Sequence, residues 1–231
     1  MATTESAAEV CLPKGALLIG ESRLETASGG KCAHVNPATG RAQAWLPLAG
    51  PKEIDAAVAA ACAAQPRWRT LTPSGRRDLL LRLASLLEQN SDELSTIVAL
   101  ETGTPKIASG AAPHAAADHF RYYAGWIDKI EGNVTPVDAQ ETLNYSVLEP
   151  YGVVAVILTW NSPLYSIAMT VAPPLAAGNT VVLKPPELAP FAALRFGELC
   201  LEAGFHPALS TSCPVVLRQE RCSSGIRTST R

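Results

Sequence analysis

The alternation of apolar and polar positions is most distinctive in the second half of the chain. Residues 152–158 (GVVAVIL) form a continuous apolar run rich in β-branched side chains. Such a run is typical of a strand buried on both faces of a parallel sheet. A polar break follows, and Pro163 then suits the first turn of a helix that the pattern extends to Ala177. Because a second apolar strand follows at residues 180–183, the pattern predicts a strand–helix–strand unit with parallel strands.

Helical periodicity dominates the first half of the chain. Apolar residues recur at helical spacing on one face of several segments, which predicts amphipathic helices packed on a core. A short apolar segment before them is a predicted strand. The expected strand is 16–20, and the expected helices are 51–64, 73–88, 91–100 and 107–130.

Three further segments complete the expected organisation. Residues 133–149 alternate loosely between apolar and polar positions, which predicts an antiparallel hairpin that leads into the first buried strand. Residues 190–203 are a predicted helix that Gly204 ends. Residues 1–14 carry no periodic pattern, and we expect them to be a mobile lead-in.

Composition narrows the class of protein. The 231 residues are 47% hydrophobic and 17% charged, with a net charge of −2, which describes a globular chain. This charge gives no electrostatic reason to expect nucleic acid or a membrane surface as a partner. No apolar run approaches a membrane span and no secretory signal is seen at the start, so we expect a cytoplasmic protein. Its six cysteines lack metal-site spacing, so we expect free thiols and no metal site.

The span from 149 to 187 carries several motifs in a fixed order. It resembles the NAD(P)-dependent aldehyde dehydrogenase family, and the resemblance extends over about residues 15–205. The resemblance implies an α/β fold with a Rossmann-like doubly wound parallel sheet, of which this chain would form a truncated, N-terminal portion. The matching segments are 150–154 (PYGVV), 160–163 (WNSP), 173–185 (PPLAAGNTVVLKP) and Glu187, together with turns at 36–40 (NPATG) and 101–105 (ETGTP).

The resemblance also implies roles for individual residues. Asn161 would donate its side-chain amide to the oxyanion that forms when a thiolate attacks an aldehyde, a task for which a fixed, uncharged donor is suited. Lys184 and Glu187 would hold the adenosine ribose hydroxyls of NAD or NADP. The cofactor cleft beyond the strand ends would be lined by the backbone of Leu158, Thr159 and Trp160.

Two positions depart from the family pattern. Thr159 stands where the family usually has proline, and Thr170 stands where it often has lysine. Taken singly, Trp160 and Asn161 also fit an ordinary turn at a strand end, and Lys184 fits a solvated surface charge. Their occurrence together and in order favours the functional interpretation.

The resemblance stops at His206, and we expect residues 206–231 to be a non-homologous tail. The third base of each tail codon can be read together with the first two bases of the next codon. With permitted third bases, this shifted frame can encode a family-like sequence that begins Pro-Pro-Gly-Leu-Val-Asn-Val-Val-Pro-Gly. We therefore expect that a single-frame slip near Phe205 or His206 replaced the continuation and ended the chain early. The expected domain would then be residues 15–205, the first part of the cofactor-binding domain with the hairpin at 133–149.

Two functions follow from the resemblance. One is oxidation of an aldehyde to a carboxylic acid with NAD or NADP, through a cysteine thiohemiacetal, in a protein whose family members are expected to be homo-oligomers. The alternative is an inactive fragment without the nucleophilic cysteine and the general-base glutamate, which binds nucleotide weakly or associates with an intact homologue. Glu187 would favour NAD by repelling a 2′-phosphate, whereas Lys184 could pair with that phosphate, so the choice between NAD and NADP stays open.

Overall fold

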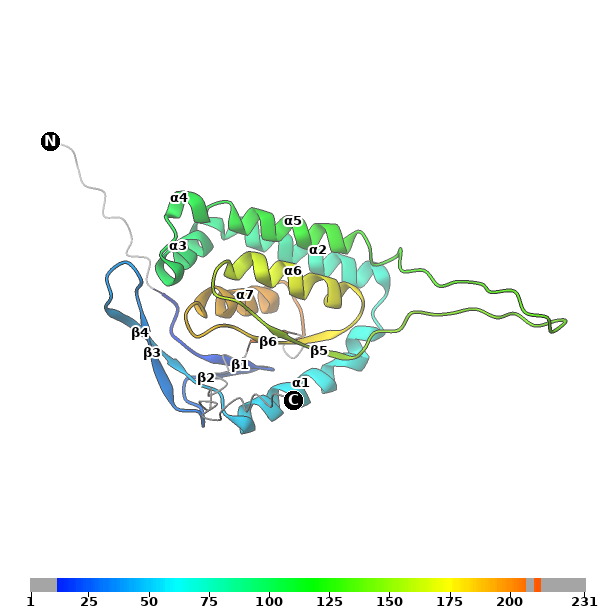
Figure 1. Ribbon diagram of the computed structural model, residues 1–231, viewed down its shortest axis with the longest axis horizontal. Helices are drawn as coiled ribbons and strands as arrows, with labels where there is room; N and C mark the ends of the chain where they lie inside the picture. The colour runs from blue at the N-terminus through cyan, green and yellow to red at the C-terminus, as the bar shows by residue number, and fades with distance from the viewer. Residues whose placement is uncertain (1–11, 207–209, 213–231) are drawn as a thin grey trace, which may run out of the picture.

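A parallel sheet lies at the centre of the molecule (Figure 1). The structure is a computed structural model that describes residues 12–206 and 210–212. Because all the strand pairs of this sheet are parallel, the predicted parallel arrangement is confirmed. The strands lie in the order β5-β6-β7 and comprise β5 (Val153–Ile157), β6 (Thr180–Lys184) and β7 (Ser210–Ser212).

Helices cover both faces of this sheet, as a doubly wound fold requires. The crossover helices α6 (Pro163–Ala176) and α7 (Phe191–Glu202) lie on one face, and α1 (Pro51–Arg69) crosses the other (Figure 1). The hydroxyl of Thr180 in β6 donates to the carbonyl of Ala61 in α1 at 3.0 Å, which ties that helix to the strand. The α/β architecture predicted from the sequence is confirmed.

The turn from α6 into β6 also fixes the start of β5. Gly178 has φ +90°, a left-handed conformation that ends the helix, and the backbone N–H of Asn179 donates to the carbonyl of Pro174 at 2.9 Å. The side-chain carbonyl of Asn179 accepts a hydrogen bond from the backbone N–H of Gly152 at 3.0 Å. One buried asparagine therefore joins both strands of the predicted unit at their amino ends.

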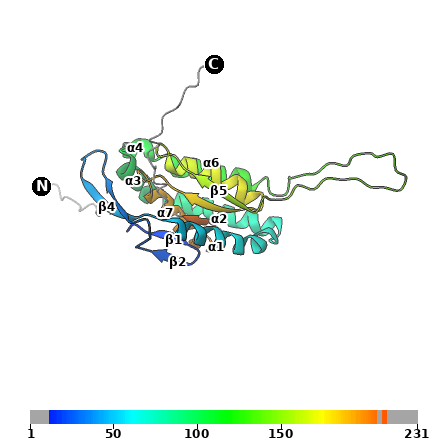
Figure 2. The same cartoon turned by 60° about the horizontal axis from the view of Figure 1, so that its bottom comes forward.

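A second helical layer packs outside α6 and α7 (Figures 1 and 2). Its largest buried side chains include Leu80, Leu83 and Phe120, and the Phe120 ring stacks on Phe196 of α7 with centroids 5.7 Å apart. Burial of such rings contributes much of the stability of a core. The helices of this layer are α2 (Pro73–Gln89), α3 (Ser91–Thr102), α4 (Lys106–Ser109) and α5 (Ala112–Ala124).

The single helix predicted at 107–130 is wrong. The structure divides it into α4 and α5, with a break at residues 110–111, and α5 ends six residues before the predicted end. Pro113 lies in the first turn of α5, where its missing N–H leaves no carbonyl unpaired, so it favours a new start there over a continuous helix. Gly125 follows the last residue of α5, and glycine disfavours continuation of a helix.

Two antiparallel hairpins precede α1 and flank the sheet (Figure 2). The second hairpin lies beside the turn that follows β6, because its residue His34 is hydrogen-bonded to the carbonyl of Leu188. The first hairpin pairs β1 (Leu17–Ile19) with β2 (Ser22–Leu24), and the second pairs β3 (Lys31–Val35) with β4 (Ala42–Pro47).

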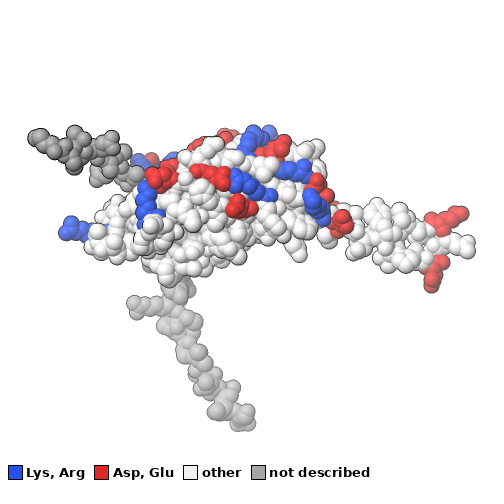
Figure 3. Space-filling model, turned by 90° about the horizontal axis from the view of Figure 1, so that it is seen from above, with Lys and Arg blue, Asp and Glu red and all other residues white. Residues whose placement is uncertain are grey.

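The segment predicted to be a hairpin at 133–149 is a long arm that projects from the body (Figure 1). Its two sides run antiparallel, joined by a bridge between Val134 and Tyr145 and by two backbone hydrogen bonds. The pairing therefore has the predicted direction but is too sparse for regular strands. Acidic side chains stand out on the arm in Figure 3, whereas the body carries both signs of charge.

The ends of the chain are described in part. The predicted lead-in lies outside the described residues up to residue 11, but Lys14 forms an ion pair with Glu25 at 2.6 Å. The predicted tail at 206–231 contains β7, which pairs in parallel with β6; residues 207–209 and 213–231 lie outside the described residues. None of the helices that the structure describes combines the length and apolar character needed to cross a bilayer.

Candidate functional site

The candidate site begins where β5 and β6 end side by side. Ile157 pairs with Lys184 in the parallel register, and the backbone N–H of Leu158 donates to the carbonyl of Lys184 at 3.0 Å. The Leu158 side chain is buried in the main core. The two carboxyl ends are therefore held together at one edge of the sheet, the edge at which open α/β sheets bind ligands.

Asn161 lies in the turn between β5 and α6. The turn closes on α6 because the carbonyl of Ser162 accepts the backbone N–H of Ser166 at 2.8 Å and Pro163 occupies the first helical turn. The Asn161 side chain is exposed and makes no hydrogen bond to any described residue. It lines a cavity of about 110 Å³ that also includes Thr104 and Tyr165. An amide with both N–H groups unpaired is available to donate to a ligand oxygen.

Thr159 and Trp160 directly precede Asn161, and each makes a contact of its own. Trp160 is 58% exposed and lines a second cavity of about 210 Å³, together with Glu101 and Leu188. The Thr159 hydroxyl lies 3.4 Å from that of Ser166. Threonine therefore forms a local contact with the start of α6 that a proline at this position would lack.

Lys184 and Glu187 form an ion pair directly after β6. The Lys184 ammonium lies 2.7 Å from a Glu187 carboxylate oxygen, and both side chains are partly buried, at 17% and 35% exposure. This geometry excludes the interpretation of Lys184 as a lone solvated charge. An ammonium donor beside a carboxylate acceptor is a donor set that suits a pair of vicinal hydroxyls, each of which both donates and accepts. The residues present therefore fit a ribose.

The turn that carries Glu187 is held at its far end by a buried carboxyl group. Glu101, at the end of α3, is 3% exposed and accepts the backbone N–H of Phe191 at 2.7 Å and that of Ala192 at 3.3 Å. These are the first backbone donors of α7, so Glu101 caps that helix from another element. Burial raises the pKa of Glu101 to about 8, although the backbone hydrogen bonds oppose the shift.

A buried histidine holds the same turn at its middle. His34 in β3 is 2% exposed, and its Nε2 lies 2.9 Å from the carbonyl oxygen of Leu188, next to Glu187. Its Nδ1 lies 3.0 Å from the side-chain nitrogen of Gln43 in β4. Burial lowers the pKa of His34, which favours the neutral ring.

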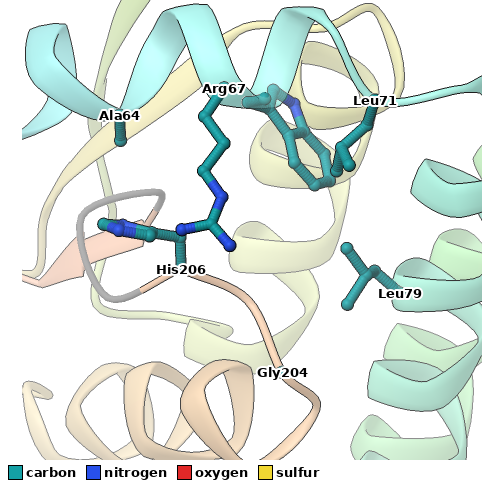
Figure 4. A pocket seen from close by; sticks show the side chains of 7 residues that line it. Ala64, Arg67, Leu71, Leu79, Gly204 and His206 are labelled. Atoms are coloured by element: carbon teal, nitrogen blue, oxygen red, sulfur yellow. The ribbon is translucent and has the colours of Figure 1, made fainter.

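A further cavity lies away from the strand ends (Figure 4). It measures about 140 Å³ and lies between α1, the start of α2 and the end of α7. None of the predicted site residues lines it. Its lining consists of Ala64, Arg67, Trp68, Leu71, Leu79, Gly204 and His206.

Across residues 12–206 and 210–212, no group of three or more His, Cys, Asp or Glu side chains is arranged to hold an ion. None of the described cysteines forms a disulfide, and none lines the Asn161 cavity: Cys62 is exposed on α1, Cys200 is buried in α7, and Cys32 lies in β3.

Glu101 and His34 were missed as functional residues by the sequence analysis, which treated their surroundings only as turns. No local signal marks Glu101, because it lies at the carboxyl end of its own helix and caps a helix that begins 90 positions later. No local signal marks His34 either, because its partner Leu188 is 154 positions away. Their contacts depend on the tertiary fold.

The chain is similar in sequence to proteins of one known family. The profile of the "Aldehyde dehydrogenase family" matches residues 24–215, so the match ends inside the predicted tail. A (Z)-2-((N-methylformamido)methylene)-5-hydroxybutyrolactone dehydrogenase from Acinetobacter baylyi is 43% identical over 173 residues, which are 74% of this chain and 36% of that protein. The cytosolic 10-formyltetrahydrofolate dehydrogenase of Xenopus tropicalis is 40% identical over 77% of this chain and 20% of its own length.

Solved structures give the same result. The crystal structure of PnpE in complex with nicotinamide adenine dinucleotide superposes with a TM-score of 0.85 at 40% identity, covering 88% of this chain and 42% of that chain. An NADP-dependent enzyme of E. coli superposes with a TM-score of 0.83 at 31% identity. This chain thus spans less than half the length of these relatives. On its sequence and its fold, the chain belongs to the aldehyde dehydrogenase family.

Proposed function

We propose that this chain carries the oxyanion donor and the ribose contacts of an enzyme that oxidises an aldehyde to a carboxylic acid with NAD or NADP. The observation that supports this most directly is the unpaired amide of Asn161 at the end of β5, beside the Lys184–Glu187 pair at the end of β6. Membership of the family and the NAD-bound relative support the choice of reaction class.

In the proposed reaction, a cysteine thiolate adds to the carbonyl carbon of the aldehyde. A carbon–sulfur bond forms, and the carbonyl electron pair moves to the oxygen, which becomes an oxyanion. The Asn161 amide donates a hydrogen bond to that oxyanion and lowers the barrier to addition. The bound nicotinamide supplies the hydride acceptor that the oxidation needs, and water then releases the acid from the thioester.

The nucleophile is proposed to lie outside residues 15–205, as the family resemblance implies. None of the described cysteines lines the Asn161 cavity. Burial and the nearby Glu187 carboxylate raise the pKa of the Cys32 thiol, which disfavours the reactive thiolate there. Cys200 is buried in the core.

Lys184 and Glu187 are proposed to hold the adenosine ribose. Without nucleotide they satisfy one another, so binding replaces part of this ion pair with hydrogen bonds to hydroxyls. A carboxylate at this place disfavours the phosphate of NADP, and the ammonium favours it. We propose NAD as the preferred cofactor because Glu187 is the more exposed of the two side chains. Its carboxylate is therefore the more accessible to a ligand and would repel a 2′-phosphate.

A second proposal concerns the chain by itself, which would bind nucleotide without oxidising aldehydes. The specific observation is again that no described cysteine lines the Asn161 cavity.

In the whole protein, the arm is a candidate contact between subunits of a homo-oligomer, because Val134, Leu143 and Val147 on it are exposed apolar residues. We propose a cytoplasmic location because the cysteine spacing of the sequence predicts no disulfide framework, which suits a reducing compartment.

The proposal is tested by nucleotide binding to the 231-residue chain, measured by isothermal titration calorimetry. We expect saturable binding of NAD that weakens roughly tenfold in Glu187→Gln, since a hydrogen bond to a charged group contributes about 1.5–3 kcal/mol. Glu141→Gln on the arm is the matched control and should bind as the parent does. Absence of binding by the parent, or equal binding by both variants, would remove the ribose assignment.

A further inference from the structure

We propose that His34 is a positioning residue for the nucleotide site, holding the backbone of the Glu187–Leu188 turn so that the Glu187 carboxylate meets the ribose. This inference rests on the proposed function. His34 would not touch the nucleotide itself. It acts from β3 through the carbonyl of Leu188, 2.9 Å from its Nε2.

The hydrogen bonds around His34 fix which ring nitrogen carries the proton. The Gln43 side-chain carbonyl accepts from the Asn36 amide at 2.8 Å, so the Gln43 nitrogen is a donor. That nitrogen donates to the carbonyl of Leu100 at 2.8 Å and to Nδ1 of His34 at 3.0 Å. With Nδ1 accepting, the neutral ring carries its proton on Nε2 and donates it to Leu188. The histidine is thus a donor of fixed orientation.

The turn needs such support because its own sequence supplies few hydrogen-bond donors. Pro185, Pro186 and Pro190 have no backbone N–H, and the bond from Ala189 to the carbonyl of Pro186 is long, at 3.3 Å. Strand β6 holds the start of the turn at residue 184, and Glu101 holds its end at Phe191. Between these points, His34 supplies a buried tether beside Glu187.

The environment of β3 supports this placement. Cys32 and His34 alternate along the strand and therefore face the same side. The Glu187 charge acts on Cys32, and Leu188 contacts His34, so this face of β3 runs along the turn. The His34 ring also lies edge-on to Phe191, with centroids 5.1 Å apart. The histidine is consequently packed as well as hydrogen-bonded.

Two amide substitutions separate the Nε2 donor from general packing. Glutamine can place its amide nitrogen near the position of Nε2, whereas the shorter asparagine reaches only the position of Nδ1. Both are polar and uncharged, so His34→Gln and His34→Asn form a matched pair. His114→Asn on an exposed helical position is the control for the loss of a histidine. Circular dichroism at 25 °C identifies variants that remain folded.

The first measurement is hydrogen–deuterium exchange of the peptide that covers residues 184–192, without nucleotide. We expect His34→Asn to speed exchange of this peptide by roughly tenfold, the loss of about one buried hydrogen bond, and His34→Gln and His114→Asn to leave it unchanged. This result does not depend on nucleotide binding. Equal exchange in His34→Asn and His34→Gln would overturn the tether.

The second measurement compares NAD with its analogue lacking the adenosine 2′-hydroxyl, by calorimetry on the full chain. We expect the parent and His34→Gln to prefer NAD by roughly tenfold, and His34→Asn to lose most of that preference. If the parent does not discriminate, the proposed function fails. If the parent discriminates and His34→Asn does so equally, the positioning role fails while the proposed function stands. If His34→Asn does not fold, Gln43→Leu, which frees Nδ1, must reduce the preference instead, and full retention would overturn the inference.

Discussion

Glu101 and Phe191, 90 positions apart, are joined by a hydrogen bond of 2.7 Å from the backbone N–H of Phe191 to the Glu101 carboxyl group. The contact fixes the amino end of α7 to the end of α3. It also leaves an ionisable group in the core, because Glu101 is 3% exposed. The turn that carries Glu187 lies between β6 and this point, so its geometry depends on a residue outside the strand–helix–strand unit.

The buried Glu101 makes stability depend on pH. Burial raises its pKa from 4.5 to about 8, so the folded state keeps a proton that the unfolded state loses. Stability from this group is therefore full below about pH 4.5 and falls as the pH rises toward 8. Urea unfolding at several pH values should show this decline, and Glu101→Gln should flatten it. An unchanged slope in Glu101→Gln would show that Glu101 does not cause the decline.

Glu53 has the opposite dependence. Its carboxylate accepts hydrogen bonds from the Ser28 hydroxyl and from the backbone N–H of Gly50 at 2.8 Å, at the start of α1. These bonds, chiefly that from Ser28, lower its pKa from 4.5 to about 2. Its contribution is present above about pH 4.5 and is lost as the pH falls toward 2. Ser28→Ala should lower the free energy of unfolding at pH 7 by about 1 kcal/mol, measured by urea titration.

The control for that experiment is Ser74→Ala, at an exposed hydroxyl in the first turn of α2. It should change the free energy of unfolding by less than about 0.5 kcal/mol. If Ser28→Ala left both the stability at pH 7 and its acid dependence as in the parent, the cap at Glu53 would lack the role assigned to it.

The 231-residue chain should form no NADH when mixed with NAD and a panel of aldehydes. No described cysteine lines the cavity of Asn161, so we expect no thiohemiacetal to form and no oxyanion for the amide to stabilise. Absorbance at the NADH band measures the reaction directly. Turnover that disappeared on replacing Cys32, Cys62 or Cys200 with serine would show that this chain supplies its own nucleophile.

In a longer protein that contains the family's cysteine, Asn161→Ala should reduce kcat by roughly a hundredfold or more, the loss associated with removing one oxyanion donor. The affinity for NAD should change by less than about twofold, because the proposed ribose contacts of Lys184 and Glu187 are separate from the amide. Asn144→Ala on the arm is the matched control and should retain full activity. A loss confined to NAD affinity would instead place Asn161 in the cofactor site.

Cofactor preference should depend on the charge of Glu187. Replacing its carboxylate with the neutral amide in Glu187→Gln removes repulsion of a 2′-phosphate while Lys184 remains. We expect the ratio of NADP to NAD affinity to rise by roughly tenfold or more. Lys184→Met should shift the ratio in the opposite direction. Calorimetry with both nucleotides measures the two ratios, and a common shift in both variants would contradict the assignment of charge roles.

The strands around the site were predictable because their signals are local. The run at 152–158 and the stop at Gly178 specify a strand and a helix end within a few residues, and both are present in the structure. The predicted helix at 107–130 was too long because its helical periodicity outweighed the break before Pro113 and the stop at Gly125. Helical periodicity alone, without a clear stop such as Gly178, does not mark where a helix ends.

The supports of the site could not be predicted in the same way. Leu188 and Phe191 each bind a side chain from a distant part of the chain, and neither partner shows its role in its own neighbourhood. The assignment of Asn161, Lys184 and Glu187 to the site rests on the family resemblance. That Lys184 and Glu187 pair with each other, however, required their coordinates.

The hydrogen bond between His34 and Leu188 also has a consequence in time. During synthesis, residue 34 leaves the ribosome long before residue 188, and the two must then close a loop of 154 residues. Contacts this distant in sequence form slowly, whereas helices such as α2 need only near neighbours. The turn that carries Glu187 should therefore form last, after the helical layer has condensed. A nascent chain would then be compact for some time before the proposed ribose contacts were in place.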